Sequence, residues 1–249
     1  MTTALQQRSA AWHAARRGKL TASNLGAAMG QVSYVSRKQA FLRATGQEEF
    51  VGNVACDWGT ANEANGIMEY QALTGNVVQA TGLHIHPTYN WMAGSPDGFV
   101  GTEGMIEVKC PYYRRKDGSR AHATVPGHYY MQMNALLEIT ERAWCDYVCW
   151  TPETVKIYRV YRNSQFFEAM LPFYSQFYAA MSMHATSPPP ISKSELTMIN
   201  ETVSDAITNS VDLKFWNLAD SADLPPSSDL MDEDADEIQA TGCKRGRLC

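Results

Sequence analysis

The sequence lacks any run of eighteen or more uncharged apolar residues, so it contains no segment of the length and polarity of a membrane-spanning helix. Its first residues, Met1 to Arg8, lack the basic region and the apolar stretch of a signal peptide. Its six cysteines form no CxxC pair and have no histidine at zinc-finger spacing, which favours reduced thiols. We therefore expect a soluble, intracellular protein with no membrane partner, and both cytoplasm and nucleus stay open as its compartment.

An excess of one charge is also absent from most of the chain. The net charge of −5 comes from residues 220–237, which hold eight carboxylates and no base. Without this stretch and the three bases that follow it, acidic and basic residues balance. The bases nevertheless gather in groups, namely Arg8/Arg16/Arg17/Lys19, Arg37/Lys38/Arg43 and Arg114/Arg115/Lys116/Arg120. Such groups permit a local anion-binding face, although most are simply solvated surface.

The 249 residues are 45% hydrophobic, which is enough for one sizeable core. Apolar periodicity and capping residues predict helices over 4–16, 36–45, 57–74, 126–139 and 164–183, with Thr21 and Ser23 capping a short helix that ends at Gly30. Alternation predicts a meander of strands over 77–81, 83–86, 91–94, 98–100 and 105–109, a central strand over 144–150 and a further strand over 154–161.

This order of elements predicts an α/β (α+β) fold with a central mixed β-sheet flanked by helices. We expect residues 1–190 to form one domain and residues 191–249 to form a C-terminal extension. Within the extension, a helix is expected over 195–216. The acidic residues after it lack the apolar content to fold alone, which predicts a disordered tail.

The most specific pattern joins Ser95-Pro96-Asp97-Gly98 to Glu107-Val108-Lys109, which follows ten residues after Asp97. Alternate side chains of a strand share a face, so Glu107 and Lys109 point the same way. If the turn at 101–104 folds the Asp97 strand back beside this one, the two carboxylates converge. Asp97, Glu107 and the Val108 carbonyl would then suit Mg²⁺, with Lys109 placed to orient or deprotonate a water. This arrangement is typical of metal-assisted phosphodiester hydrolysis, whereas the bare pattern by itself is more often an ordinary turn with exposed charges.

Two polar residues fall on apolar helix faces. Glu63 is in register with Ile67 and Tyr70, so its carboxylate faces inward unless it merely complements the helix dipole. Gln132 is in register with Leu136 and would place its amide toward the core, where a satisfied buried glutamine is the commoner role.

Near the start, Arg16 precedes the capped helix around Ser23. A guanidinium, a hydroxyl and free helix N–H groups there would form a pocket for a terminal phosphate. The alternative is a plain helix cap beside a solvated basic turn.

Five motifs between Trp12 and Trp150 occur in a fixed order: Trp12 with Arg16-x-Gly18-x-x-Thr21-Ala22-Ser23, Trp58-Gly59 with Glu63, Ser95-Pro96-Asp97-Gly98, Glu107-Val108-Lys109-Cys110-Pro111, and Tyr130-Met131-Gln132-Met133-Asn134. In these motifs the chain resembles the lambda-exonuclease family, the YqaJ-like viral recombination exonucleases with a restriction-endonuclease-like fold. The resemblance makes residues 1–190 a nuclease domain, and the acidic extension has no counterpart in it.

The resemblance implies a magnesium-dependent 5′-to-3′ exonuclease on double-stranded DNA ends, with Mn²⁺ as a substitute metal, that leaves 3′ single-stranded overhangs for recombination by strand annealing. By position, it implies that Asp97, Glu107 and Val108 bind the metal, that Lys109 serves the attacking water, and that Glu63 and Gln132 complete the site. Arg16 and Ser23 would receive the 5′ phosphate. A trimer and a single-strand annealing protein as partner are further implications. A restriction-like or structure-specific endonuclease, and a non-catalytic DNA-binding relative, stay as alternatives.

Overall fold

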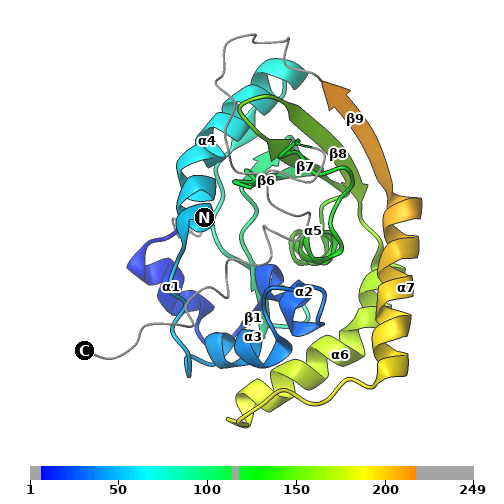
Figure 1. Ribbon diagram of the computed structural model, residues 1–249. Coiled ribbons are helices and arrows are strands. Elements are labelled where there is room, and N and C mark those ends of the chain that lie inside the picture. The colour runs from blue at the N-terminus through cyan, green and yellow to red at the C-terminus, as the bar shows by residue number, and fades with distance from the viewer. Residues whose placement is uncertain (1–6, 114–117, 217–249) are drawn as a thin grey trace.

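The structure, a computed structural model, describes residues 7–113 and 118–216 (Figure 1). Its helices are α1 (Ala10–Arg16), α2 (Leu25–Ala28), α3 (Arg37–Ala44), α4 (Val54–Thr74), α5 (Gly127–Thr140), α6 (Ser164–Ser182) and α7 (Lys193–Ser210), with a 3₁₀ turn over Ala22–Asn24. Its strands are β1 (Leu20–Thr21), β2 (Val78–Gln79), β3 (His84–Ile85), β4 (Met92–Gly94), β5 (Gly98–Val100), β6 (Gly104–Lys109), β7 (Trp144–Trp150), β8 (Val155–Tyr161) and β9 (Val211–Trp216).

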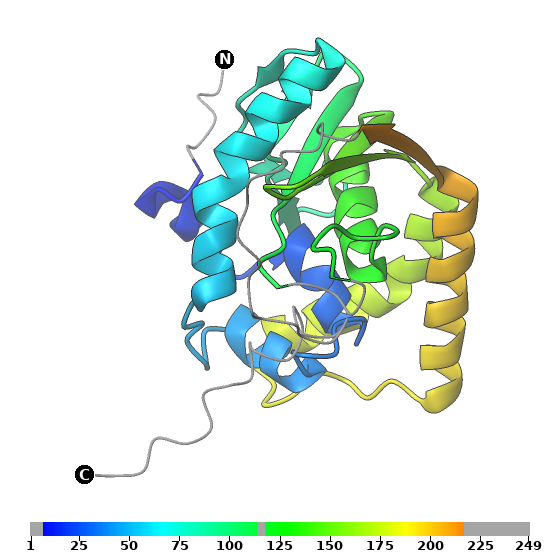
Figure 2. The ribbon, with the colours of Figure 1, turned by 45° about the horizontal axis from the view of Figure 1, so that its top comes forward.

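The main sheet has six strands in the order β2-β5-β6-β7-β8-β9, and its pairs are antiparallel except for the parallel pair β6 and β7. Helix α4 lies on one side of the molecule and α7 on the other (Figure 2). The expected mixed sheet flanked by helices is confirmed, and β7 is central as predicted. The predicted meander is wrong, because β4 pairs with β1 and β3 in a separate three-stranded sheet. Gly94 lets β4 lie directly against α5, since a Cβ there would be 2.4 Å from a Leu136 methyl carbon.

Helix α5 lies at the centre of the fold, seen end-on in Figure 1. An apolar stripe was expected on it, but all ten residues from Tyr130 to Ile139 are buried. The reason is that α5 contacts the main sheet, the small sheet and the helices α2, α6 and α7. Any polar side chain in this stretch is therefore enclosed, Gln132 included.

Helix α4 begins three residues earlier than expected, because the side chain of Asn53 accepts a hydrogen bond from Cys56 N. It ends at Gly75 as predicted, in the left-handed conformation with φ 71°. The helix lies very close to β6, since a Cβ on Gly66 would be 2.5 Å from Val108 Cγ1. Near its C-terminus, the Tyr70 hydroxyl donates to Asp146 Oδ2 at 2.8 Å and so ties α4 to β7.

Helix α3 matches its prediction, with Ser36 and Gln39 forming a capping box. Helix α1 is shorter than the expected 4–16, because Ser9 caps it and its first residue is Ala10. Residues 1–6 lie outside the described part.

The helix expected over 195–216 is wrong in its last six residues, since α7 ends at Ser210 and residues 211–216 form β9 beside β8. Helix α7 buries Ile199, Val203 and Ala206 in the main core. The division at residue 190 stays a prediction, and the acidic tail lies outside the described residues.

The four cysteines in the described ranges are free thiols, and Cys145 and Cys149 are buried on β7. In these same ranges, no helix combines the length and the apolar character needed to cross a membrane.

Candidate active site

Strands β5 and β6 bring Asp97 and Glu107 to the same end of the main sheet. Asp97 directly precedes β5, and its backbone N–H donates to Ile106 O at 3.2 Å. Its carboxylate Oδ2 accepts a 2.7 Å hydrogen bond from Val108 N. The expected fold-back of the Asp97 segment beside the Glu107 strand is therefore present.

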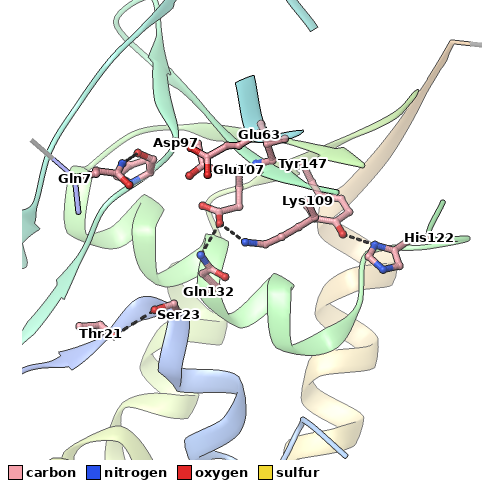
Figure 3. Close-up of polar contacts among 12 residues, drawn as sticks. Gln7, Thr21, Ser23, Glu63, Asp97, Glu107, Lys109, His122, Gln132 and Tyr147 are labelled. Atoms are coloured by element: carbon pink, nitrogen blue, oxygen red, sulfur yellow. Dashed lines mark hydrogen bonds and ion pairs between the residues drawn. The ribbon is translucent and has the colours of Figure 1, made fainter. Parts of the chain in front are cut away.

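Glu107 is 2% exposed, so it is not part of an exposed charge pair. Its Oε1 accepts two hydrogen bonds of 2.6 Å, one from Lys109 Nζ and one from Gln132 Nε2 (Figure 3). Its Oε2 is buried and has no hydrogen-bond partner. Gln132 is therefore both a satisfied buried glutamine and a contact of the candidate acid.

The two carboxylates repel one another in a desolvated setting. Burial and the charge of Glu107, with a smaller contribution from Glu63, raise the pKa of Asp97 well above its ordinary value. Burial lowers the pKa of Lys109, but Glu107, Tyr129 and Asp97 outweigh it and raise that pKa above its ordinary value. The Lys109 ammonium also lies 4.9 Å from the centroid of the Tyr129 ring. Two carboxyl groups therefore share one lysine ammonium at this site.

These residues fit a hard divalent cation. The buried Oε2 of Glu107 lacks a donor, and the neighbouring Asp97 is held in an environment that penalises its charge. The N–H and C=O of one strand residue point to the same side, so the Val108 carbonyl faces the edge where Asp97 accepts from Val108 N. Two carboxylates and a carbonyl are oxygen ligands of the kind that Mg²⁺ prefers, with water filling its other positions.

Glu63 lies near this pair on α4 (Figure 3). Its Oε2 forms a 2.6 Å ion pair with Nη2 of Arg8, which lies 55 positions earlier in the sequence. Within the ranges that the structure describes, no three His, Cys, Asp or Glu side chains gather closely enough to hold a metal ion. Glu63 therefore supplies negative charge to the site while its carboxylate is held by Arg8.

Arg16 and Ser23 lie together in a second cluster. Arg16 Nη2 donates to Thr21 Oγ1 at 3.3 Å and to Ser23 Oγ at 3.4 Å, and the two hydroxyls are 3.3 Å apart. Burial lowers the pKa of Arg16 to about 10, and among the described residues no carboxylate offsets that shift. A partly buried guanidinium beside two hydroxyls is suited to an anion.

The alternative interpretation of this segment as a plain helix cap is wrong. Thr21 makes no side-chain capping bond, and the segment divides into a three-residue 3₁₀ turn and the four-residue helix α2. Both pieces are short, so the helix dipole at this position is weak. The side chains carry the anion-binding character of the cluster.

Residues 7–12 connect the two clusters. Trp12 Nε1 donates to Ser95 Oγ at 2.9 Å, and Gln7 Nε2 donates to Pro96 O at 2.8 Å. The guanidinium carbon of Arg16 lies 4.1 Å from the centroid of a Trp12 ring. Helix α1 is thus tied to the segment that carries Asp97.

A cavity of about 390 Å³ opens beside Lys109. Arginines and aromatic side chains line much of it, including Arg8, Arg43, Tyr34, Phe50, Tyr112 and Tyr129. Glu63 and His122 also line it, whereas Arg16 and Ser23 do not.

Sequence reasoning missed three contributors, namely Thr21 as a hydroxyl beside Arg16, Arg8 as the partner of Glu63, and Tyr129 as the ring under Lys109. Arg8 and Arg43 belong to the basic groups of the sequence, but nothing in the sequence distinguished the members that line the cavity from those on the solvated surface. Arg37, from the same group as Arg43, instead donates to the backbone carbonyls of Ala28 and Pro189. Residues 114–116 lie outside the described part.

Residues 11–143 match the family model described as the YqaJ-like viral recombinase domain. The chain is also 26% identical over 157 residues to the uncharacterized protein R354 of Acanthamoeba polyphaga mimivirus, a match covering 57% of this chain and 29% of that protein. The chain therefore spans less than a third of the length of this curated relative.

Among solved structures, the alkaline exonuclease LHK-Exo of Laribacter hongkongensis is similar, with a TM-score of 0.57 and 26% identity. LHK-Exo in complex with dAMP gives a TM-score of 0.60 and 27% identity. Both comparisons cover 79% of this chain and 99% of the other. A phage related exonuclease from Haemophilus somnus 129PT, with a TM-score of 0.51, 14% identity and coverage of 67% and 95%, shares the fold.

Proposed function

The chain belongs to the YqaJ-like viral recombinase family, and from this premise we propose that it is a magnesium-dependent exonuclease that acts on double-stranded DNA. It digests one strand from its 5′ end and leaves a 3′ single-stranded overhang for recombination by annealing. The resemblance to LHK-Exo over nearly the whole length of that exonuclease supports the activity.

The observation that carries the proposal is the buried set of Asp97, Glu107, Lys109 and Gln132. It joins two desolvated carboxylates to one ammonium, and it leaves Glu107 Oε2 without a hydrogen-bond partner. A set with no metal role would place unbalanced charge in the interior, which costs free energy without a gain in stability. The set is therefore better explained by chemistry than by stability.

In the proposed mechanism, Asp97, Glu107 and the Val108 carbonyl would hold Mg²⁺, with Glu63 beside them. The ion, when bound, supplies Lewis-acid stabilisation of the charge that develops on the phosphoryl and leaving oxygens. Lys109 faces the site as an ammonium and orients the attacking water through its N–H groups. Gln132 fixes the rotamer of Glu107 by donating to Oε1, so the carboxylate is positioned before substrate arrives.

Recognition of the strand end belongs to Arg16, Thr21 and Ser23. A terminal 5′ phosphate between them would accept charge-assisted hydrogen bonds and replace the hydration that Arg16 loses through burial. Only an enzyme that starts at an end needs such a pocket, which supports an exonuclease over an endonuclease.

Assembly and partners follow from the family alone. We propose a homotrimer and a single-strand annealing protein as partner, with Mn²⁺ as a substitute for Mg²⁺. The complex of LHK-Exo with dAMP fits a reaction that releases deoxynucleoside monophosphates.

The test uses linear duplexes with 5′-phosphate or 5′-hydroxyl ends and a closed circular DNA, each incubated with Mg²⁺, Mn²⁺ or EDTA. We expect mononucleotide release that requires the metal and is fastest from the 5′-phosphorylated end. Arg16→Ala should reduce that preference, because one charge-assisted contact contributes roughly 1.5–3 kcal/mol. Rapid cleavage of the circle would instead support the endonuclease, and no cleavage of any DNA would leave a non-catalytic relative.

A further inference from the structure

The small three-stranded sheet connects the two clusters of the candidate active site. Strand β1 ends at Thr21, in the Arg16 cluster, and β4 ends three residues before Asp97. The two strands pair in parallel, with Thr21 opposite Ala93. The register of β1 on β4 therefore sets where the hydroxyls beside Arg16 lie relative to Asp97.

The turn over residues 86–92 holds this register. Leu20 N donates to Trp91 O at 2.9 Å, and Lys19 Nζ donates to Asn90 O at 2.7 Å. Both acceptors are carbonyls at the end of the turn. The position of β1 therefore depends on the shape that the turn keeps.

His86 fixes the shape of this turn from the inside. Its Nδ1 accepts hydrogen bonds from Thr88 N at 3.1 Å and from Tyr89 N at 3.2 Å. The ring is 7% exposed and stacks on Phe167 of α6, with centroids 5.5 Å apart. A ring nitrogen that accepts two N–H groups carries no proton, so His86 is neutral and its proton lies on Nε2.

A second proton has no acceptor on this ring. On Nδ1 it would point at two N–H donors and displace both of them. Nε2 is buried, and within residues 7–113 and 118–216 it has no hydrogen-bond partner. An imidazolium here would leave two donors unsatisfied, which costs free energy. The closed turn is therefore compatible only with the neutral ring.

The charges around the ring do not reverse this preference. The charged or titratable side chains that act on it are Glu138 on α5, Glu141 at the end of α5, Arg162 beyond β8, and Tyr89 in the turn itself. Glu138 already accepts hydrogen bonds from Arg162 and Ser164. Burial, aided by Arg162, outweighs the two glutamates and lowers the pKa of His86 below its ordinary value.

We propose that His86 is a positioning residue that acts as a proton-sensitive latch: the neutral ring holds the 86–92 turn closed, and protonation opens the turn and loosens β1 from β4. The latch itself is independent of the proposed function. Its effect on DNA rests on that function, because β1 and β4 lead to the residues proposed for end recognition and for metal binding.

The direction of the pH effect follows from proton uptake. The open turn exposes His86 to water, where it titrates near its ordinary pKa of about 6.5, whereas the closed turn resists the proton. The turn therefore has its full stability above about pH 7. Below about pH 6.5, opening becomes up to about tenfold easier per pH unit, until the lower pKa of the closed turn is reached.

The test measures hydrogen exchange of the DNA-free protein by mass spectrometry from about pH 5 to about pH 8, on a peptide containing residues 86–92. After correction for intrinsic exchange rates, we expect protection in the wild type to fall up to about tenfold per pH unit below about pH 6.5. His86→Asn keeps an acceptor near the position of Nδ1 and takes up no proton, so its protection should not depend on pH. His86→Phe keeps a ring against Phe167 without an acceptor, so its turn should be open at every pH.

Matched controls separate the latch from general acid effects. His184→Asn replaces an exposed histidine and should follow the wild type. A peptide over the buried residues 130–139 of α5 should keep its protection where the turn opens. The wild-type pH series contains no substitution, so it tests the latch even if a variant does not fold.

Constant protection of the wild-type turn across this pH range, or the same fall in His86→Asn as in the wild type, would overturn the inference. The effect on DNA is measured separately, by nucleotide release from a 5′-phosphorylated duplex in Mg²⁺. The DNA titrates equally with both proteins, so we expect the ratio of the wild-type rate to the His86→Asn rate to fall as the pH drops below about 6.5. A constant ratio refutes the link to DNA, and absence of release from the wild type refutes the exonuclease, while the exchange data still decide the latch.

Discussion

Trp12 Nε1 donates a 2.9 Å hydrogen bond to Ser95 Oγ, and Ser95 is two residues before Asp97. The same indole lies under the guanidinium of Arg16, four residues later on α1. One side chain therefore fixes Arg16, the candidate phosphate-binding residue, relative to the candidate metal ligand. In the proposed mechanism, this contact would set the distance between a terminal phosphate and the scissile bond.

Trp12→Phe keeps an aromatic ring under Arg16 but removes the donor to Ser95. Because a neutral hydrogen bond contributes about 1 kcal/mol, we expect roughly a fivefold fall in kcat/KM on 5′-phosphorylated ends. The preference over 5′-hydroxyl ends should shrink as well, since Arg16 is less well placed. Initial rates on the two duplexes measure this, and an unchanged ratio would show that Trp12 has only a packing role.

Asp97→Ala and Lys109→Ala should each lower turnover by orders of magnitude, because each removes a group that acts in the transition state. Asp97→Ala should also weaken Mg²⁺ binding, which calorimetry on the DNA-free protein measures. Circular dichroism checks that both variants fold. Activity near that of the wild type in either variant would refute its assignment.

Arg8→Ala frees the carboxylate of Glu63 for the candidate metal site. The Arg8 side chain is 52% exposed, so the ion pair is worth at most about 1 kcal/mol. We expect the Mg²⁺ concentration that gives half-maximal activity to fall up to roughly fivefold. The exposed neighbour Arg17→Ala is the control. A shift of equal size in both variants would point to general charge effects instead.

Asp146→Ala tests what holds α4 to the sheet. Asp146 is 2% exposed and accepts from Tyr70 and, through both carboxylate oxygens, from Arg159. Removing it leaves the buried Tyr70 hydroxyl and the partly buried Arg159 guanidinium without this partner, so we expect a loss of about 3 kcal/mol in the free energy of unfolding. Urea titration measures this loss, and the exposed Asp205→Ala should change it by less than about 0.5 kcal/mol. Equal values for the two variants would contradict the structural role of Asp146.

The elements that sequence predicted well are those whose signals are local. Ser36 with Gly46 bounds α3, and the spacing of Asp97, Glu107 and Lys109 gives two short strands that place their side chains together. The failures depend on tertiary contacts. Strand β9 forms because β8 offers it an edge, and α5 is buried on all sides because helices and two sheets surround it.

The same reason explains the site residues that sequence did not assign. Arg8 contacts Glu63 across 55 positions of chain, so no spacing rule could pair them. Phe50 is exposed, so no periodicity marks it, and only the structure places it in the lining of the cavity. Gln132 was found because its helix register is local, whereas its hydrogen bond to Glu107, 25 positions away in the sequence, could not be predicted from that register.

The close approach of α4 to β6 at Gly66 has a consequence for how this site can evolve. Gly66 is three residues after Glu63, about one turn along the same face, and even a methyl group there would collide with Val108. Any replacement pushes the helix outward and carries Glu63 away from Asp97 and Glu107. Since no residue is smaller than glycine, single substitutions at this position can only widen the space between these carboxylates. Selection at residue 66 therefore acts in one direction, toward a wider gap between α4 and β6 and not toward a closer approach.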